Sequence, residues 1–466
     1  MRHSPHGYWI EEAGAVAPAP SLSGERQADV VIVGGGYTGM WTAWHLRQLE
    51  PGARVAIVEA DTTCGRGPSG RNGGFCNGMW LSLPSMRERW GDEPALAVAH
   101  AADEAVERIA AFCSEQKVDA WLRPADYLQV STATPHDESW APAVAAAREL
   151  GFPEKVQPLS EAEVAARCAS PAFRAGVACA GSATVQPARL ANGLRERLLG
   201  AGVEIFESSP VLDFREGPDG VEVRAGGGRI RAGHAVLAMG SAAKGRHGPL
   251  RGRLTIASSH IVLTEPVPEL LEEIGWTGPD CITDSRSLLH YFRTTPDGRI
   301  AFGWGGGRIA WGARTHGRAE LDREVIEATH QHLLDYFPGL RGKRITHAWG
   351  GPIDASPTHL PLVLPLRYGR AFAAAGYTGN GVGPTNMVGR TLASLALGRR
   401  DEPASLAFVD PAPRRVPPEP FHWLGGETIR LGIMAKERAE MSGRTPGKIA
   451  SAVARIPSLI GFHIGR

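Results

Sequence analysis

The sequence predicts a mixed α/β (α+β) protein with two domains, one built on a parallel sheet covered by helices and the other on an antiparallel sheet. Three observations support this prediction. The chain has 466 residues, too many for one small core. Apolar runs such as 30–33 and 235–239 are typical of strands buried in a parallel sheet. Two longer segments, 254–264 and 288–303, have the pattern of antiparallel strands.

The segment 29–59 organises the rest of the chain. It predicts a strand, a glycine turn, a helix and a second parallel strand, over 29–33, 34–39, 37–49 and 54–59. Gly34 suits the tight turn, Gly36 the approach of a pyrophosphate, and Gly39 the packing of the helix on the strand. Glu59 is placed to accept hydrogen bonds from a ribose 2′-hydroxyl and to repel a 2′-phosphate. We therefore expect a Rossmann-like domain that binds FAD or NAD.

Composition argues against several other classes of protein. Lys and Arg number 50 and Asp and Glu 49, so the net charge does not favour nucleic acid as a partner. The six cysteines form no C-x-x-C pair, which predicts neither a metal site nor disulfides and fits a reducing cytoplasm. Residues 1–20 contain no signal-peptide pattern and are expected to be disordered, and no apolar run is long enough for a transmembrane segment.

A second glycine-rich stretch follows at 64–74, too rich in glycine for a regular element. We expect a loop that approaches a flat or charged ligand. Ser69, Arg71 and Asn72 offer a hydroxyl, a guanidinium and an amide for phosphate oxygens and the polar edge of a ring.

The two glycine motifs together resemble the D-amino-acid oxidase and glycine oxidase superfamily of FAD-dependent enzymes. The run Ser69-Gly70-Arg71-Asn72-Gly73-Gly74 is most similar to the branch with gamma-glutamylputrescine oxidase and aminophosphonate oxidoreductases. The resemblance implies FAD rather than NAD, with its isoalloxazine along this second loop.

The middle of the chain predicts an excursion into the substrate domain and a return. Amphipathic helices are expected over 93–116, 140–151 and 160–167, the last with Ser160 and Glu163 as a capping box. A helix over 188–200, a strand over 203–207, a β-meander over 211–231 and a buried strand over 235–240 follow. In flavoproteins with two dinucleotide folds, backbone near Val211 contacts the adenine and the strand ending at Met239 and Gly240 meets the cofactor.

The strand over 288–303, turned at 295–299, carries the substrate-facing candidates. Because side chains alternate, either Leu289, Tyr291 and Arg293 or His290 and Phe292 face the flavin. We favour Tyr291 and Arg293, since a phenol and a guanidinium would suit a substrate carboxylate or phosphonate. The alternative is a core tyrosine and a surface arginine.

A third glycine loop, 376–383, follows a buried strand over 370–375 and opens a helix to 397. It resembles the family's Gly-Tyr/Phe-Ser-Gly-His-Gly pattern, with Thr378 for serine and Asn380 for histidine. Some relatives hold flavin through a cysteine near this loop; here no cysteine follows Cys281, which implies non-covalent FAD. Upstream, a helix is expected over 320–337, and Trp349 is a candidate wall of the substrate pocket.

The tail from 410 begins with a proline-rich linker and predicts two amphipathic helices over 427–441 and 448–460. Their Arg and Lys residues lie on the polar side, which allows docking on a membrane surface. Packing on the FAD-binding domain or on a partner subunit is the interpretation that we favour.

These patterns combine into one hypothesis: FAD accepts a hydride from the C–H beside the nitrogen of a small amine or amino acid, and water hydrolyses the imine. A hydroxy-acid oxidoreductase of the same fold and a non-catalytic FAD-binding protein are the alternatives. The electron acceptor, O₂ or another, is open: Lys244 or a histidine would have to replace the lysine that assists O₂ in sarcosine-type oxidases, and a quinone is the other candidate. A homodimer is also left open.

We assign 1–25 to an N-terminal lead-in, 26–90, 158–245 and 350–409 to a discontinuous FAD-binding domain, 91–157 and 246–349 to a substrate domain, and 410–466 to a C-terminal helical tail. The residues expected at the cofactor are Gly34, Gly36, Tyr37, Thr38, Gly39, Glu59, Ala60, Ser69, Arg71, Asn72, Gly73, Val211, Met239, Gly240, Gly376, Gly379, Asn380, Gly381 and Val382. Those expected to act on substrate are Tyr291, Arg293, Asn72 and Trp349.

Overall fold

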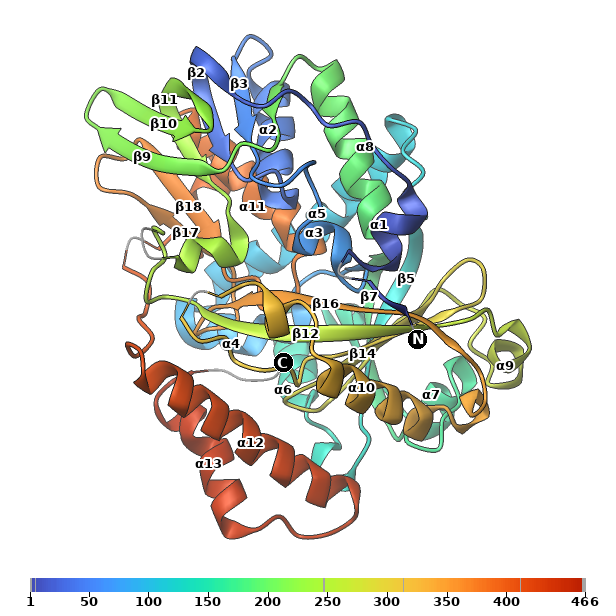
Figure 1. The fold of residues 1–466 in the computed structure, drawn as a ribbon. Helices are drawn as coiled ribbons and strands as arrows, with labels where there is room; N and C mark the ends of the chain where they lie inside the picture. The colour runs from blue at the N-terminus through green and yellow to red at the C-terminus, as the bar shows by residue number, and fades with distance from the viewer. Residues whose placement is uncertain (1, 5, 246–247, 313, 411, 463–466) are drawn as a thin grey trace.

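The computed structural model describes residues 2–4, 6–245, 248–312, 314–410 and 412–462, and in it the chain folds around two sheets (Figure 1). One has eight strands and a parallel centre, and the other has ten strands and is mostly antiparallel. The predicted two-domain mixed α/β architecture is confirmed.

The eight-stranded sheet is centred on β2, which pairs in parallel with β3 on one side and β11 on the other. Its strands are β2 (Ser23–Val33), β3 (Val55–Val58), β8 (Glu204–Phe206), β9 (Val211–Gly217), β10 (Gly220–Ala225), β11 (Gly227–Leu237), β17 (Leu362–Pro365) and β18 (Ala371–Ala375). The meander and the buried strand predicted over 211–240 are joined, because β11 is one continuous strand that pairs with β10 first and with β2 along its whole length.

Three helices pack beside this sheet, namely α2 (Tyr37–Leu49), α8 (Pro187–Gly200) and α11 (Val382–Ala396). Helices α2 and α11 approach closely because Gly389 has no side chain: a Cβ there would lie 2.8 Å from Cβ of Trp41. Helix α5 (Asp92–Glu115) joins the same core through Phe112, whose ring meets that of Trp41 edge to face at 5.1 Å.

The ten-stranded sheet runs across the molecule below the first in the view of Figure 1. Its strands are β1 (Arg2–His3), β4 (Phe75–Cys76), β5 (Arg123–Val130), β6 (Val156–Leu159), β7 (Gly176–Thr184), β12 (Thr255–Thr264), β13 (Cys281–Asp284), β14 (His290–Thr294), β15 (Ile300–Trp304) and β16 (Ile345–Ala355). Helix α10 (Arg323–Tyr336) contributes Leu333 and Tyr336 to an aromatic core with Phe292 and Phe302.

The remaining helices are short and lie mostly around the second sheet. They are α1 (Gly7–Ala13), α3 (Pro68–Arg71), α4 (Leu83–Trp90), α6 (Ala141–Glu149), α7 (Glu161–Arg167) and α9 (Pro268–Glu273). The capping box predicted for α7 is confirmed: the Ser160 hydroxyl accepts from Glu163 N, and the Glu163 carboxylate accepts from Ser160 N.

The described residues of the N-terminal lead-in include a helix packed against the rest of the protein, so for them the expectation of disorder is wrong. Its helix α1 carries Trp9, which has no exposed surface and meets Trp349 edge to face at 6.0 Å. Lone aromatic residues in a segment rich in proline and glycine gave no periodic signal from which this docking could be predicted.

Sheet membership also differs from the predicted domain boundaries. Strands β4 and β7 and most of β16 fall within segments assigned to the FAD-binding domain but pair in the ten-stranded sheet. The chain thus crosses between the two sheets more often than predicted, because strand patterns do not reveal which partner a strand will take.

The tail forms a helical hairpin of α12 (Phe421–Met441) and α13 (Lys448–Leu459), at the bottom of Figure 1. The two helices touch where α12 has a glycine: a Cβ on Gly432 would lie 2.5 Å from a methyl carbon of Val453. Among the residues described, no helix is both long and apolar enough to cross a bilayer.

Candidate functional site

A cavity of about 1160 Å³ lies where the two sheets meet, and the predicted glycine loops open onto it. Its walls come from both sheets and from the C-terminal hairpin. This volume exceeds the range of about 300–1,000 Å³ that is usual for small-molecule pockets, so it has room for a dinucleotide together with a small substrate.

Main-chain oxygen atoms pack tightly against two glycines of the first glycine turn, Gly34 and Gly39. Gly34 has φ +108°, and a Cβ there would collide with the carbonyl oxygen of Ala238 on the neighbouring strand. Gly39 does not line the cavity; a Cβ at this position would collide with the carbonyl oxygen of Gly34. The turn therefore brings the N-terminus of α2, a favourable place for a phosphate, to the cavity wall.

Glu59 directly follows β3 and lines the cavity. Its carboxylate accepts from the backbone N–H of Gly35 at 2.5 Å and from that of Asp61 at 2.8 Å. Burial raises its pKa above the ordinary value. A fixed carboxylate at the end of the second strand suits the ribose hydroxyls of a dinucleotide.

The second glycine loop contains a short helix, α3, where an irregular loop was predicted. Its end is held from outside by two indoles: Trp9 Nε1 donates to Asn72 O at 2.9 Å and Trp349 Nε1 donates to Arg71 O at 2.8 Å. Trp349 has no exposed surface and is absent from the cavity wall, so its assignment as a wall of the substrate pocket is corrected.

Asn72 organises the same loop from inside. Its amide nitrogen donates to Ser69 O at 2.8 Å and its amide oxygen accepts from Gly74 N at 2.7 Å. The Ser69 hydroxyl accepts from Tyr37 N at 2.9 Å, which ties this loop to the first turn of α2. The first and second glycine loops therefore form one connected wall.

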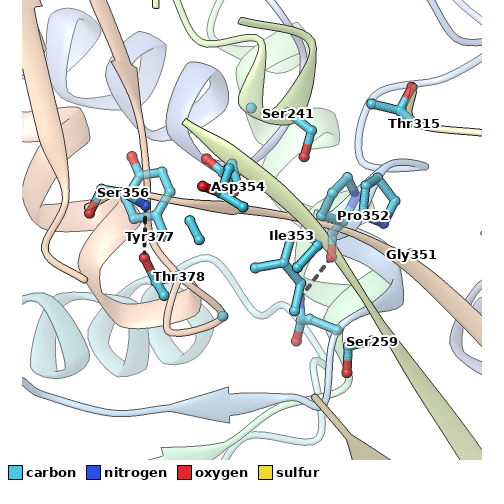
Figure 2. Close-up of a pocket in the computed structure, with 18 of the residues that line it drawn as sticks. Ser241, Ser259, Thr315, Gly351, Pro352, Ile353, Asp354, Ser356, Tyr377 and Thr378 are labelled. Carbon is cyan, nitrogen blue, oxygen red and sulfur yellow. Dashed lines mark hydrogen bonds between the residues drawn. The ribbon is translucent and has the colours of Figure 1, made fainter. Parts of the chain in front are cut away.

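The third loop is anchored by Asp354, which lines the cavity from the end of β16 (Figure 2). Its carboxylate accepts from Gly376 N at 2.6 Å, and its carbonyl accepts from Thr378 N at 3.0 Å. Burial raises the pKa of Asp354 to about 6. The neighbouring Tyr377 hydroxyl is 2.7 Å from that of Thr38, so the third loop is joined to α2 as well.

The ten-stranded sheet presents Tyr291 to the cavity, with its ring next to the main chain of Gly73 and Gly303. The Tyr291 hydroxyl lies 2.7 Å from Ser259 Oγ, and Ser259 Oγ donates to Trp304 O at 2.9 Å. Burial raises the pKa of Tyr291 to about 12, so the phenol stays neutral at physiological pH.

Arg293 lies outside the cavity wall, contrary to the prediction of a guanidinium that faces substrate. Its Nη1 donates to Val185 O at 2.5 Å and to Gly74 O at 3.1 Å, and 1% of the residue is exposed. The strand register was assigned correctly, but the long side chain passes beneath the second glycine loop and holds that loop in place.

Most of the other predicted cofactor residues do line the cavity. They are Gly34, Gly36, Tyr37, Thr38, Glu59, Ala60, Ser69, Arg71, Asn72, Gly73, Val211, Met239, Gly240, Gly379, Gly381 and Val382. Gly376 and Asn380 do not line the cavity. The Gly376 N–H donates to the Asp354 carboxylate, and Asn380 Nδ2 donates to Gly78 O at 3.3 Å.

Sequence reasoning missed the hairpin as part of the site. Phe421, Ile429 and Ile433 of α12 and Ile456 of α13 line the cavity. Glu437, 2% exposed, accepts from Ser287 N at 2.7 Å and Leu288 N at 3.3 Å, and so fixes a cavity-lining loop. The sequence did predict two amphipathic helices here, but amphipathic periodicity does not reveal which surface the apolar face of a helix will cover.

Lys244, named above for a role with O₂, lies behind His422, which does line the cavity. Lys244 Nζ is 3.0 Å from His422 Nδ1, and Thr255 Oγ1 is 2.9 Å from His422 Nε2. Burial lowers the pKa of Lys244 to about 8.

Comparisons with known proteins show the family to which the chain belongs. Residues 29–395 match the family model DAO, described as FAD dependent oxidoreductase. Two relatives are the probable oxidoreductase OrdL of Rhizobium meliloti, 28% identical over 86% of this chain and 90% of its own, and the gamma-glutamylputrescine oxidoreductase of Escherichia coli, 27% identical over 95% of this chain and 99% of its own.

Among solved structures, glycine oxidase from Geobacillus kaustophilus shares the fold with a TM-score of 0.66, at 20% identity over 81% of this chain and 96% of its own. The glycine turns, the carboxylate at the end of the second strand and the size of the cavity fit FAD. The chain belongs to the FAD dependent oxidoreductase family, and FAD is its cofactor.

Proposed function

We propose that this oxidoreductase acts on a small amine, taking a hydride from the carbon beside the nitrogen so that an imine forms and is hydrolysed by water. Bound FAD would supply the hydride acceptor at N5 of its ring. The protein would supply a dry pocket that holds the amine in its neutral form and in the right orientation. The observation that carries the proposal is Tyr291 on the cavity wall, with its hydroxyl 2.7 Å from Ser259 Oγ.

The direction of the hydrogen bonds around Tyr291 follows from its neighbours. Because the Ser259 hydroxyl donates its only proton to Trp304 O, it accepts from the Tyr291 hydroxyl. The phenol oxygen then has a lone pair free to accept an N–H of a substrate. A neutral phenol also cannot form an ion pair with an ammonium, which favours the reactive neutral amine.

Apart from Ser259, apolar side chains lie near Tyr291 on the cavity wall. Ile261 belongs to the same hydrophobic cluster as Tyr291, and Leu288 and Leu289 precede it closely on the chain and also line the cavity. Such walls disfavour the charged form of a bound ammonium and lower its pKa, so the amine can bind neutral without a dedicated base. The apolar walls therefore support a substrate that binds as a neutral amine over a substrate whose reacting group stays charged.

The cavity's arginines are already engaged, which favours an amine over an α-amino acid. Among the described residues, Arg71 and Arg430 line the cavity, Arg71 at 3.5 Å from Glu320 and Arg430 at 2.9 Å from Glu427. Arg430 also donates to Gly306 O. A substrate carboxylate would have to compete with these carboxylates for the guanidinium groups. Our proposed substrate class thus agrees with the printed name of the Escherichia coli relative.

The remaining assignments extend this proposal. The Lys244–His422 pair supports O₂ as the electron acceptor, because a cation near reduced flavin would stabilise developing superoxide charge. The six cysteines, all among the described residues, are buried thiols outside the cavity wall, which supports a cytoplasmic location and FAD held without a cysteinyl bond.

The test is anaerobic titration of the purified holoenzyme with amines, α-amino acids and hydroxy acids while the absorbance of oxidised flavin is followed. We expect bleaching by a primary or secondary amine and restoration of colour when air is admitted. Bleaching by hydroxy acids alone would instead establish the hydroxy-acid alternative, and no bleaching by any of the three classes would favour a non-catalytic protein.

A further inference from the structure

The C-terminal hairpin displays an apolar stripe to solvent. On α13, the exposed residues Ile449, Ala452, Ile456 and Leu459 recur at spacings of three and four, so they share one helix face. Ile449 is 82% exposed and Leu459 is 80% exposed. These values are unusual for large aliphatic side chains that have no partner to cover them.

Helix α12 adds a second apolar face. Phe421, Leu424 and Leu431 lie on one side of it and are 70%, 52% and 56% exposed. Its opposite side, which includes Ile433 and Glu437, packs on the body of the protein. The hairpin is thus attached by one side and offers apolar side chains on the other.

The Lys, Arg, Asp and Glu positions in the part of this surface that follows α12 are all basic. Between Met441 and Phe462 the chain contains Arg444, Lys448 and Arg455 and no carboxylate side chain. Lys448 and Arg455 each precede a residue of the apolar stripe, so they flank it.

The carboxylates of α12 are turned away from this surface or neutralised. Glu437 pairs with Arg286 at 3.1 Å and Glu440 with Lys436 at 2.5 Å, and both glutamates are at least nine-tenths buried. Glu427 pairs with Arg430 on its own helix. The outward face of the hairpin therefore combines apolar side chains with unopposed positive charge.

We infer that the outward face of the hairpin docks on an anionic lipid bilayer, with the α13 stripe inserted at the level of the headgroups and Lys448 and Arg455 against the lipid phosphates. Helices that lie in a membrane interface have this combination of an apolar face and flanking basic residues. The inference does not depend on which substrate the enzyme oxidises.

A second copy of the chain would fit this surface less well. In a two-fold dimer the patch meets its own equivalent, so the three cations of 441–462 would approach their counterparts without carboxylates between them. An anionic bilayer supplies the missing negative charge.

The docking surface reaches the mouth of the cavity. Phe421, Ile456 and Ile460 are exposed and also line the cavity, so they form part of its rim. A bilayer bound to this face would therefore lie beside the entrance, and amphiphilic molecules would reach the flavin site without crossing bulk water.

The experiment is flotation of the FAD-loaded, full-length protein with vesicles of phosphatidylcholine, alone or mixed with phosphatidylglycerol. We expect binding to the mixed vesicles, weakened by added salt, and little binding to phosphatidylcholine alone. The double substitution I449D/L459D should lower the partition coefficient by about a hundredfold or more. K448Q/R455Q should lower it by about thirtyfold.

Matched controls separate docking from general effects of charge. L199D alters an exposed leucine of α8, and K343Q/R400Q removes two exposed cations elsewhere; both should float like the wild type. All variants should keep the flavin spectrum and turnover, because the altered side chains lie outside the cavity wall.

Three results would overturn the inference. They are failure of the wild-type holoenzyme to float with mixed vesicles, flotation of I449D/L459D equal to that of the wild type, and a dimer in light scattering that the same double substitution dissociates. The last would assign the surface to a second copy of the chain.

Discussion

The half of the cavity beside the eight-stranded sheet is walled mainly by backbone, whereas the half beside the ten-stranded sheet is walled by side chains. In the first half, Gly34, Gly36 and Gly73 present main-chain atoms to the cavity, and the absence of a Cβ lets Ala238 O, Ser69 Oγ and the Tyr291 ring pack closely against them. In the second half, Tyr291, Leu288 and Ile433 set the shape and polarity. We expect the backbone half to hold the FAD and the side-chain half to vary with the substrate.

The two halves also differ in how they are supported. The backbone half is cross-linked by hydrogen bonds among its own loops, such as those of Ser69 and Asn72. The side-chain half depends on a helix from the far end of the chain, through Glu437. Substitutions in the two halves should consequently have separable effects on FAD retention and on substrate turnover.

The largest effect is expected in the backbone half. Gly34→Ala places a methyl group against Ala238 O at a φ of +108°, and strain plus overpacking should cost up to about 6 kcal/mol. The protein should purify without its yellow colour, as absorbance and FAD titration will show. Gly200→Ala, at a helical position with open space, is the control and should retain FAD. Full FAD occupancy in Gly34→Ala would refute the assigned role of this turn.

Glu437→Ala should affect the side-chain half next most strongly. It leaves Arg286 without its carboxylate, and Ser287 and Leu288 lose an acceptor, at a cost of about 3–5 kcal/mol. Urea unfolding should show the loss, with KM raised and FAD affinity retained. Glu437→Gln should lose less because its amide oxygen still accepts from Ser287. The control, Arg438→Ala on the exposed side of α12, should be near neutral.

Asp354 sits where the two halves join, and its effect depends on pH. Because burial raises its pKa from 3.8 to about 6, the folded protein binds this proton more tightly than the unfolded chain does. The resulting stability is fully present below about pH 4 and is lost as pH rises through about 6, a total of about 3 kcal/mol. Unfolding free energies measured across this range should fall for the wild type relative to Asp354→Asn. Parallel profiles for the two proteins would contradict this.

Tyr291→Phe should have the smallest effect and test the substrate half alone. Loss of one hydrogen-bond acceptor should lower kcat/KM for an amine by about ten- to thirtyfold, or about 1–2 kcal/mol. The ring still packs on Gly73 and Gly303, so FAD content should not change. Tyr368→Phe, on an exposed tyrosine, provides the matched control. An equal loss in both variants, or loss of FAD, would remove Tyr291 from the proposed role.

The contrast between the backbone half and the side-chain half of the cavity explains which parts of the site could be predicted from sequence. A glycine between a strand and a helix usually marks a tight turn at a ligand site, so Gly34, Glu59 and Gly381 could be placed at the cavity from local pattern alone. Tyr291 followed from strand alternation.

Arg293 and Trp349 could not be placed correctly in the same way. Alternation gives the face of a strand but not where a long side chain ends, and Arg293 ends beneath Gly74. Trp349 turns toward α1, whose docking had no periodic signal. The hairpin was predicted as helices, but its contact with the loop at Ser287 joins residues about 150 apart, which no local pattern encodes.

The dependence of the cavity on both ends of the chain has a consequence for biosynthesis. Trp9 holds the second glycine loop, and Phe421, Ile433 and Ile456 complete the wall, so the binding site spans nearly the whole polypeptide. A chain still being synthesised lacks this part of the wall until α12 and α13 have emerged from the ribosome. FAD should therefore be retained tightly only after both helices have packed on the cavity, and a premature stop before α12 should yield a protein that displays all three glycine loops yet loses its cofactor.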